Sequence, residues 1–154
     1  MSAKSTFKYP FPEDLDLNID RVMSLISDCY MLNRSAVNSD TDKLVERLQL
    51  ELDAKVLESP AGSECLSWFT PNNWHVRKAQ LKTMTGKVLV DFDDNPLHLW
   101  THSVSFSGPI DRKTLLNNHI ATDKDRPHEF TYEYRNGYRS GVREWGFSIP
   151  YNIV

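Results

Sequence analysis

The sequence predicts an α+β fold, in which two N-terminal helices precede a mainly antiparallel β-sheet or small sandwich that contains one short helix. Three observations support this class. Apolar residues recur at helical spacing in the first third of the chain, the composition shifts near residue 60, and short apolar runs separated by turn residues follow. We therefore divide the 154 residues into an N-terminal arm with two helices, residues 1–60, and a β-rich domain, residues 61–154.

One apolar stripe predicts each of the two helices. Apolar residues lie three and four positions apart over residues 17–30, which is the spacing of one helical face, and again over residues 40–53. Pro10 and Pro12 exclude a regular helix from the first dozen residues, because proline lacks a backbone donor and restricts the residue before it. That segment is expected to form an extended arm.

Beyond residue 60 the pattern predicts six strands and one short helix. Turn residues such as Pro71-Asn72-Asn73 and Thr85-Gly86 separate the apolar runs. Asp111 is suited to cap a short helix through Leu116. The expected strands are residues 66–70, 76–82, 88–92, 97–106, 130–134 and 145–149.

The charge balance and the cysteine usage exclude several classes of protein. The net charge is -3, the pI is about 5.9 and the basic residues are scattered, so nucleic-acid binding is not expected. Cys29 and Cys65 stand apart without the spacing of a metal site or a disulfide framework, which favours a reducing cytoplasm. The chain has no apolar run of membrane-spanning length and no signal-peptide pattern. We expect a soluble, cytoplasmic protein that does not enter membranes.

Two histidines are the strongest candidates for acid/base chemistry. His98 and His102 are four residues apart in the expected strand 97–106, and the period of two in a strand places both on one face. Asp91 and Asp94, on the preceding strand and turn, would orient them. The alternative is that both histidines are hydrogen-bonded packing residues. No third ligand completes a metal set, so we expect no metal and no other cofactor.

Aromatic and basic residues provide a second kind of candidate site. Trp74, Trp100 and Tyr132 would line a ligand-binding cleft, because aromatic side chains offer a flat apolar surface with a polar edge. Arg34 and Arg143 lie in expected loops and would hold an anionic group through forked hydrogen bonds. Alternatively, the aromatic residues form the core and the arginines are simply solvated. The sequence leaves both interpretations open.

Four motifs, spread over residues 17–153, point to one known family. They are Asn-Arg-Ser at residues 33–35, Ser-Trp-Phe-Thr-Pro-Asn-Asn-Trp at 67–74, Val-Asp-Phe with Asn-Pro-Leu-His at 90–98, and Trp-Gly-Phe-Ser followed by Pro-Tyr-Asn at 145–152. Together they resemble motifs of the zinc aminopeptidase-like family, whose members are often encoded near polysaccharide-biosynthesis genes.

The resemblance implies an architecture and a limit on the chemistry. In such proteins the segment matching residues 61–145 is a β-rich insertion into a peptidase domain. The metal ligands of the family lie downstream of the Trp-Gly-Phe motif, beyond Val154, so zinc aminopeptidase activity is not expected from this truncated chain alone. The sequence also departs from the family pattern at Asn33, His102 and Ser148, where cysteine, tyrosine and cysteine are usual.

Three functional hypotheses follow from these observations. The first is a non-catalytic module that binds a small-molecule ligand, a peptide ligand or a partner protein. The alternative is a small, metal-independent acid/base enzyme of a biosynthetic pathway that uses the His98/His102 face. The third is a homodimer formed through the N-terminal helices, because the resemblance implies that the sheet covering their apolar stripes is missing.

Overall fold

The computed structural model describes residues 19–129, 131–133 and 142–154. The chain divides into two compact units, Met1–Tyr30 and Met31–Val154. The first unit contains helix α1 (Ile19–Cys29), which confirms the first expected helix, and the side chain of Cys29 is buried. The expected extended arm lies outside the described residues.

The second unit begins with a loop and helix α2 (Ser39–Glu51), close to the range expected for the second helix. Asn38 is the N-cap residue: its Oδ1 accepts hydrogen bonds from the N–H groups of Asp40 and Thr41, at 2.8 and 3.3 Å. Asn38 Nδ2 also donates to the carbonyl oxygen of Asn33 at 3.0 Å, and the Asn33 N–H donates to Asp40 Oδ2 at 3.0 Å. The loop before α2 is therefore held by its own side chains.

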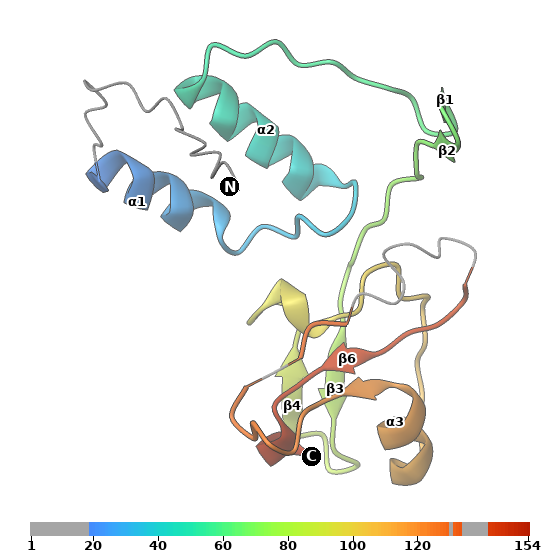
Figure 1. Cartoon of the computed structure of the whole chain (residues 1–154). Coiled ribbons are helices and arrows are strands. Elements are labelled where there is room, and N and C mark those ends of the chain that lie inside the picture. The colour runs from blue at the N-terminus through green and yellow to red at the C-terminus, as the bar shows by residue number, and fades with distance from the viewer. Residues whose placement is uncertain (1–18, 130, 134–141) are drawn as a thin grey trace, which may run out of the picture. The chain divides into compact units, whose positions relative to one another are not determined.

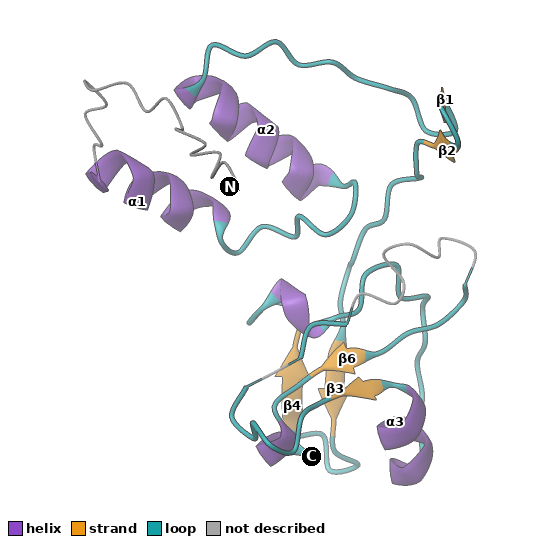
Figure 2. Ribbon diagram, viewed as in Figure 1, coloured by secondary structure: helices purple, strands orange, loops and turns teal. Residues whose placement is uncertain are grey.

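Among the described residues, the strands pair in three separate two-stranded sheets (Figure 2). The antiparallel pairs are β1 (Glu64–Cys65) with β2 (Trp68–Phe69), and β3 (Gln80–Lys82) with β4 (Val88–Asp91). The parallel pair is β5 (Ile120–Ala121) with β6 (Phe147–Ser148). The predicted α+β class is confirmed, although the sheets are smaller than expected and one pair is parallel.

Helix α3 (Arg112–Asn118) is the short helix expected after Asp111, whose side chain accepts a hydrogen bond from the Thr114 N–H at 2.9 Å. Figure 1 shows α3 leading directly into β5. The following backbone pairs with β6, because the Phe147 N–H donates to the His119 carbonyl oxygen at 2.8 Å. The cap at Asp111 therefore fixes where the chain turns into the β5–β6 pair.

The predicted strand 97–106 is wrong. Residues Pro96–His98 form a 3-10 helix, η1, because the Asn95 side chain accepts a backbone hydrogen bond at 3.0 Å and proline occupies the start of the helix. His102 has a φ of 61°, a left-handed conformation outside the β region. Of the strand expected at 130–134, residues 131–133 are described and have no strand conformation.

A small core lies where β4, the segment after η1, and β6 meet. Its buried members, none more than 7% exposed, are Val90, Leu99, Phe147 and Ile149. Trp100 is 2% exposed, and its ring lies against the Cα of Gly146. The sequence motif Trp-Gly-Phe-Ser thus supplies both a core side chain and a close backbone contact.

Ser148 gives a testable prediction about this core. The side chain is fully buried, and its Oγ has no hydrogen-bond partner among the described residues. Because a buried polar group without a partner destabilises the folded state, we expect Ser148→Ala to leave the free energy of unfolding unchanged or to raise it by about 1 kcal/mol. The midpoint of urea unfolding measures this.

Ser103→Ala is the matched control, since the Ser103 Oγ donates to the Trp100 carbonyl oxygen at 2.7 Å. We expect this control to lower the free energy of unfolding by about 1 kcal/mol, the typical net value of one hydrogen bond. Equal losses of stability in Ser148→Ala and Ser103→Ala would show that the Ser148 hydroxyl is satisfied.

Candidate functional site

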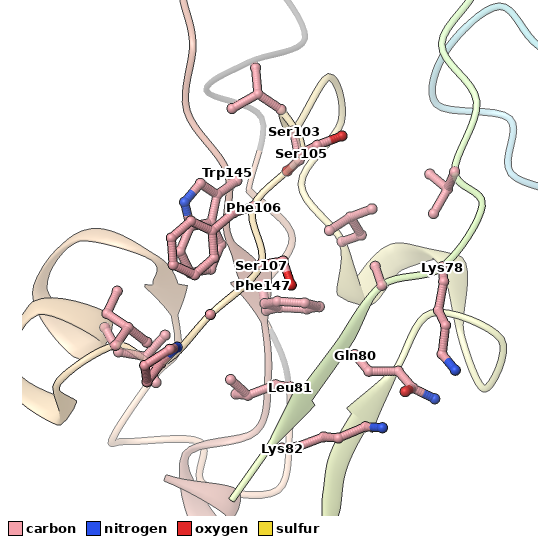
Figure 3. Close-up of a pocket in the computed structure, with 18 of the residues that line it drawn as sticks. Lys78, Gln80, Leu81, Lys82, Ser103, Ser105, Phe106, Ser107, Trp145 and Phe147 are labelled. Carbon is pink, nitrogen blue, oxygen red and sulfur yellow. The ribbon is translucent and has the colours of Figure 1, made fainter. Parts of the chain in front are cut away.

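A groove of about 1030 Å³ runs along β3 in the second unit. One wall is formed by residues 74–84, which include β3, and the other by residues 103–110. Trp145 and Phe147 also line the groove; Figure 3 shows Phe147 between the two walls and Trp145 beside Phe106. We call this feature the β3 groove.

The aromatic wall of the β3 groove is fixed by ring stacking. The ring of Trp145 stacks on Phe106, with centroids 4.5 Å apart and planes inclined by 11°, and on His119, at 3.9 Å and 8°. His119 Nδ1 lies 2.7 Å from the Trp145 carbonyl oxygen, which holds the imidazole in place. Phe106 is still 51% exposed, so the groove presents a rigid apolar surface to solvent.

Trp74, a predicted ligand-binding residue, lies in the β3 groove and is held at both of its nitrogen atoms. Its Nε1–H donates to the Ser103 carbonyl oxygen at 3.1 Å, and its backbone N–H donates to the Val37 carbonyl oxygen at 2.9 Å. The indole therefore connects the two walls at one end of the groove and ties the loop before α2 to them.

A second, smaller cavity of about 370 Å³ brings together three of the predicted residues. Trp74, His102 and Arg143 all line it, and the rings of Trp74 and His102 lie 5.9 Å apart, tilted by 56°. The Val104 N–H donates to the Glu144 carbonyl oxygen at 2.9 Å, which brings the chain around Arg143 close to the chain around His102. We call this cavity the His102 pocket. Its side chains offer an aromatic face, an imidazole and a guanidinium to a small polar ligand.

His102 combines an unusual backbone with a perturbed pKa. A φ of 61° is uncommon for residues other than glycine, although histidine adopts it more often than most, and such conformations concentrate at functional positions. Burial lowers the pKa of the His102 imidazole below its ordinary value of 6.5. The side chain is therefore neutral at neutral pH and can accept or donate a hydrogen bond in the pocket.

The His102 pKa predicts how stability depends on pH. Because the pKa is lower in the folded chain than in the unfolded chain, the unfolded state binds more protons as the pH falls below about 6.5. This contribution to stability is complete above pH 6.5 and is lost as the pH falls through the folded-state pKa. His102→Asn keeps a residue that tolerates positive φ and removes the titration.

We expect the free energy of unfolding of His102→Asn to fall less between pH 7.5 and pH 5 than that of the unchanged chain, as measured by urea unfolding at each pH. Identical slopes for the two proteins would contradict a lowered His102 pKa. A higher stability of His102→Asn at pH 7.5 would be consistent with the backbone strain alone.

The shared face proposed for His98 and His102 is wrong, because the two residues do not belong to one strand. His98 lies in η1, and its Nδ1 is 2.7 Å from the Ser148 carbonyl oxygen. A carbonyl oxygen only accepts, so His98 Nδ1 carries the proton. His98 therefore anchors η1 to β6, which is the packing role that the sequence left open.

Among the described residues, no hydrogen bond joins either predicted carboxylate to a histidine. Asp91 accepts a hydrogen bond from Gln80 Nε2 on β3 and another from the Asp93 N–H at 3.2 Å. The hydrogen bond from Gln80 has the largest effect on the pKa of Asp91. This bond, the Asp93 bond and the nearby lysine charges all lower that pKa, which makes Asp91 a weaker base. Asp94 is exposed in the turn after β4, where its N–H donates to the Asp91 carbonyl oxygen at 3.3 Å.

The remaining predicted residues lie apart from the His102 pocket. Trp100 is 2% exposed and packs in the interior, as the core alternative expected. The Tyr132 hydroxyl is 3.0 Å from Thr101 Oγ1 and half-buried, and Arg34 is exposed in the loop before α2. Their roles in ligand binding stay predictions.

Sequence reasoning missed the opposite wall of the β3 groove. The expected strand 97–106 ends with Ser105 and Phe106, whereas both residues, like Ser107 after them, are exposed in an irregular segment. Gly108 and Pro109, which follow directly, are turn-forming residues that could have signalled the irregular path.

The described part of the chain contains neither a metal-binding cluster nor a membrane-spanning helix. Across residues 19–129, 131–133 and 142–154, no cluster of three or more His, Cys, Asp or Glu side chains is placed to hold a metal ion. None of the helices in the same residues has the length and apolar character that a membrane span requires.

Comparison with protein families assigns the chain to one of them. Residues 73–154 match a family described as a domain of unknown function, DUF2172, and the chain belongs to this family. The matched range includes both walls of the β3 groove. It also includes the lining residues of the His102 pocket, apart from Pro71 and Asn72.

Two longer proteins from Clostridium acetobutylicum are similar to the chain. One, named for polysaccharide biosynthesis and an aminopeptidase-like domain, is 23% identical over 137 residues, which cover 85% of this chain and 29% of that protein. The other is a crystal structure described as a candidate peptidase, with 20% identity, a TM-score of 0.75, and coverage of 87% of this chain and 31% of that one. The chain thus spans less than a third of either relative, and the names agree with the aminopeptidase-like resemblance.

Proposed function

We propose that this chain is a non-catalytic, ligand-binding module of an aminopeptidase-like protein, with the β3 groove as its binding site. One observation carries the proposal: the groove of about 1030 Å³ combines a rigid aromatic wall with a strand whose second edge has no partner strand among the described residues. Ligand sites are typically concave, largely preformed and mostly apolar, with a few polar groups that give orientation.

The comparisons support the aminopeptidase-like part of the proposal. Both similar proteins carry peptidase or aminopeptidase-like names, and both extend well beyond the segment that matches this chain. We propose that zinc-dependent hydrolysis, which the sequence resemblance implies, is carried by the part of such proteins that this chain does not match. The module would then position a ligand for chemistry performed elsewhere.

The acid/base hypothesis has less support. His98 is anchored to Ser148, and Asp91 is bonded to Gln80 and Asp93, so neither is arranged as an acid or a base beside a substrate. The His102 pocket is compatible with binding a small anion at Arg143, which would make it an accessory part of the same binding module. Dimerisation through the N-terminal helices, α1 and α2, stays a prediction that sedimentation at several concentrations would test.

Backbone amide chemical shifts test the proposed function. The ¹⁵N-labelled chain is titrated with a pool of short peptides and, separately, with a pool of oligosaccharides, and free amino acids are assayed in the same samples. We expect one pool to shift amides of residues 74–84 and 103–110 without release of amino acids. Shifts confined to other residues, or chelator-sensitive release of amino acids, would overturn the proposal.

A further inference from the structure

The outer edge of β3 pairs with no other strand among the described residues, which leaves a short row of backbone hydrogen-bonding groups. In an antiparallel pair, successive residues direct their N–H and C=O groups alternately toward the partner strand and away from it. The Phe92 N–H donates to the Ala79 carbonyl oxygen at 2.9 Å, and the Thr83 N–H donates to the Lys87 carbonyl oxygen at 2.9 Å, so Ala79 and Thr83 face β4 on either side of the register shift between Leu81 and Lys82. The backbone groups of Gln80 and Lys82 therefore point to the other edge, which forms a wall of the β3 groove.

The opposite wall offers a similar row. Residues 105–109 have no regular secondary structure, and no hydrogen bond within the described chain involves their backbone N–H or C=O groups. Residues 105–109 and β3 both line the groove, so the groove lies between them. A chain lying in the groove would thus find backbone donors and acceptors on two sides.

The two faces of β3 have different chemistry. Figure 3 shows the side chains of Lys78, Gln80 and Lys82 on one side of the strand and Leu81 on the other, toward Phe147. Leu81 packs against the core, whereas both lysine charges lie close enough to Asp91 to lower the pKa of its carboxyl. A strand added beside β3 would therefore have an apolar face and a face next to two ammonium groups.

The charge of the groove favours an anionic occupant. Its described lining residues include Arg77, Lys78, Lys82 and Arg112, and none is an aspartate or a glutamate. Asp91, which is outside the lining, lies near Lys78 and Lys82, and Arg112 donates to the Val154 carbonyl oxygen at 3.1 Å, so the lining carries an excess of positive charge that these groups offset only in part. Complementary charge steers association and fixes the register of a bound strand.

We propose that the β3 groove binds an extended acidic peptide, with alternating apolar and acidic side chains, as an added strand on the free edge of β3. The inference rests on the proposed function and names its ligand class: a free peptide, the kind of molecule on which aminopeptidases act. Main-chain hydrogen bonds to β3 give the binding energy, and the alternating side chains give the specificity.

A carbohydrate fits the same groove less well. Sugars bind aromatic residues by stacking on an open ring face, and the ring of Trp145 is already stacked on both Phe106 and His119. The groups that the groove offers to a ligand are backbone N–H and C=O groups, and an extended peptide complements a strand edge along the whole length of the edge.

The test uses the whole chain and one designed probe. The probe is a fluorescein-labelled hexapeptide of alternating valine and glutamate with blocked ends, and fluorescence anisotropy gives its dissociation constant. The first comparison probe is a valine–lysine peptide of the same length. The other two are versions of the valine–glutamate peptide in which every second amide is N-methylated, at the valine residues in one version and at the glutamate residues in the other. N-methylation removes the hydrogen-bond donors of the peptide without changing the protein.

We expect the acidic peptide to bind at least about tenfold more tightly than the lysine peptide, and at least one N-methylated version to lose about tenfold, since a few net hydrogen bonds account for that factor. The double variant Lys78→Glu, Lys82→Glu should weaken binding of the acidic peptide by a similar factor. Lys87→Glu, an exposed residue in the β3–β4 turn outside the groove lining, is the matched control and should leave it unchanged.

Equal binding of the acidic and lysine peptides, or undiminished binding of both N-methylated peptides, would overturn the inference. Oligosaccharides that shift the groove amides while no peptide binds would also overturn it, but would leave the proposed function standing. Absence of any ligand in the groove would contradict both.

Discussion

Gly146→Ala is expected to lower the free energy of unfolding by about 1–3 kcal/mol, the usual cost of forcing extra atoms into a packed interior. A Cβ at position 146 would lie 2.5 Å from Trp100 Cε3, and 2.6 Å from Cδ2 and Cζ3 of the same ring. The ring cannot move aside easily, because Trp100 is 2% exposed, and the backbone N–H of Trp100 donates to the Gly146 carbonyl oxygen at 3.0 Å, which holds the two segments together. Glycine is required here by a close approach, not by its backbone conformation.

A double-mutant cycle separates this clash from other effects of the methyl group. Phenylalanine lacks the fused six-membered ring of the indole, to which Cε3 and Cζ3 belong, so Trp100→Phe should relieve two of the three close contacts. We expect Gly146→Ala to cost clearly less stability in the Trp100→Phe background than in the unchanged chain, measured by urea unfolding. The same cost in both backgrounds would show that Trp100 is not the obstacle.

Ile149→Ala is expected to lower the free energy of unfolding by about 2–5 kcal/mol, because it removes a large buried side chain and leaves a cavity. Ile149 is 2% exposed and belongs to the core cluster that joins β4 to β6. Its N–H donates to the Ala121 carbonyl oxygen at 3.0 Å, so the side chain lies where the C-terminal segment is also held by backbone bonds.

Leu50→Ala is the control for Ile149→Ala. Leu50 is similar in size and 81% exposed on α2, so its truncation should change the free energy of unfolding by no more than about 0.5 kcal/mol. Comparable losses of stability in the two variants, by calorimetry or urea unfolding, would contradict the assignment of the core to β4, β6 and the segment after η1.

Local signals explain how much of the fold could be predicted. α1 and α2 follow from apolar spacing, and α3 follows from the cap at Asp111, whose hydrogen bond to Thr114 involves neighbours in the sequence. The segment 97–106 was mistaken for a strand because its apolar alternation outweighed the Asn95-Pro96 signal for a 3-10 turn.

The candidate site depended on contacts between distant residues, so the sequence predicted only some of its parts. Trp74, His102 and Arg143 were proposed for different reasons, and tertiary structure brings them to one pocket. The stacking of Phe106 on Trp145 joins residues 39 positions apart, and no local pattern signals such a contact. The free edge of β3 likewise became visible only when its single partner strand was known.

The central claim is that the β3 groove is a binding site. Its most direct test is amide hydrogen exchange, measured with and without a saturating concentration of the valine–glutamate peptide. We expect bound peptide to slow exchange at Gln80 and Lys82, whose N–H groups point to the free edge, while Leu81, which faces β4, changes little. Slowed exchange at Gln80 and Lys82 would place the ligand on β3 as an added strand. Unchanged exchange at both amides, in a chain shown by anisotropy to be saturated with peptide, would contradict the account.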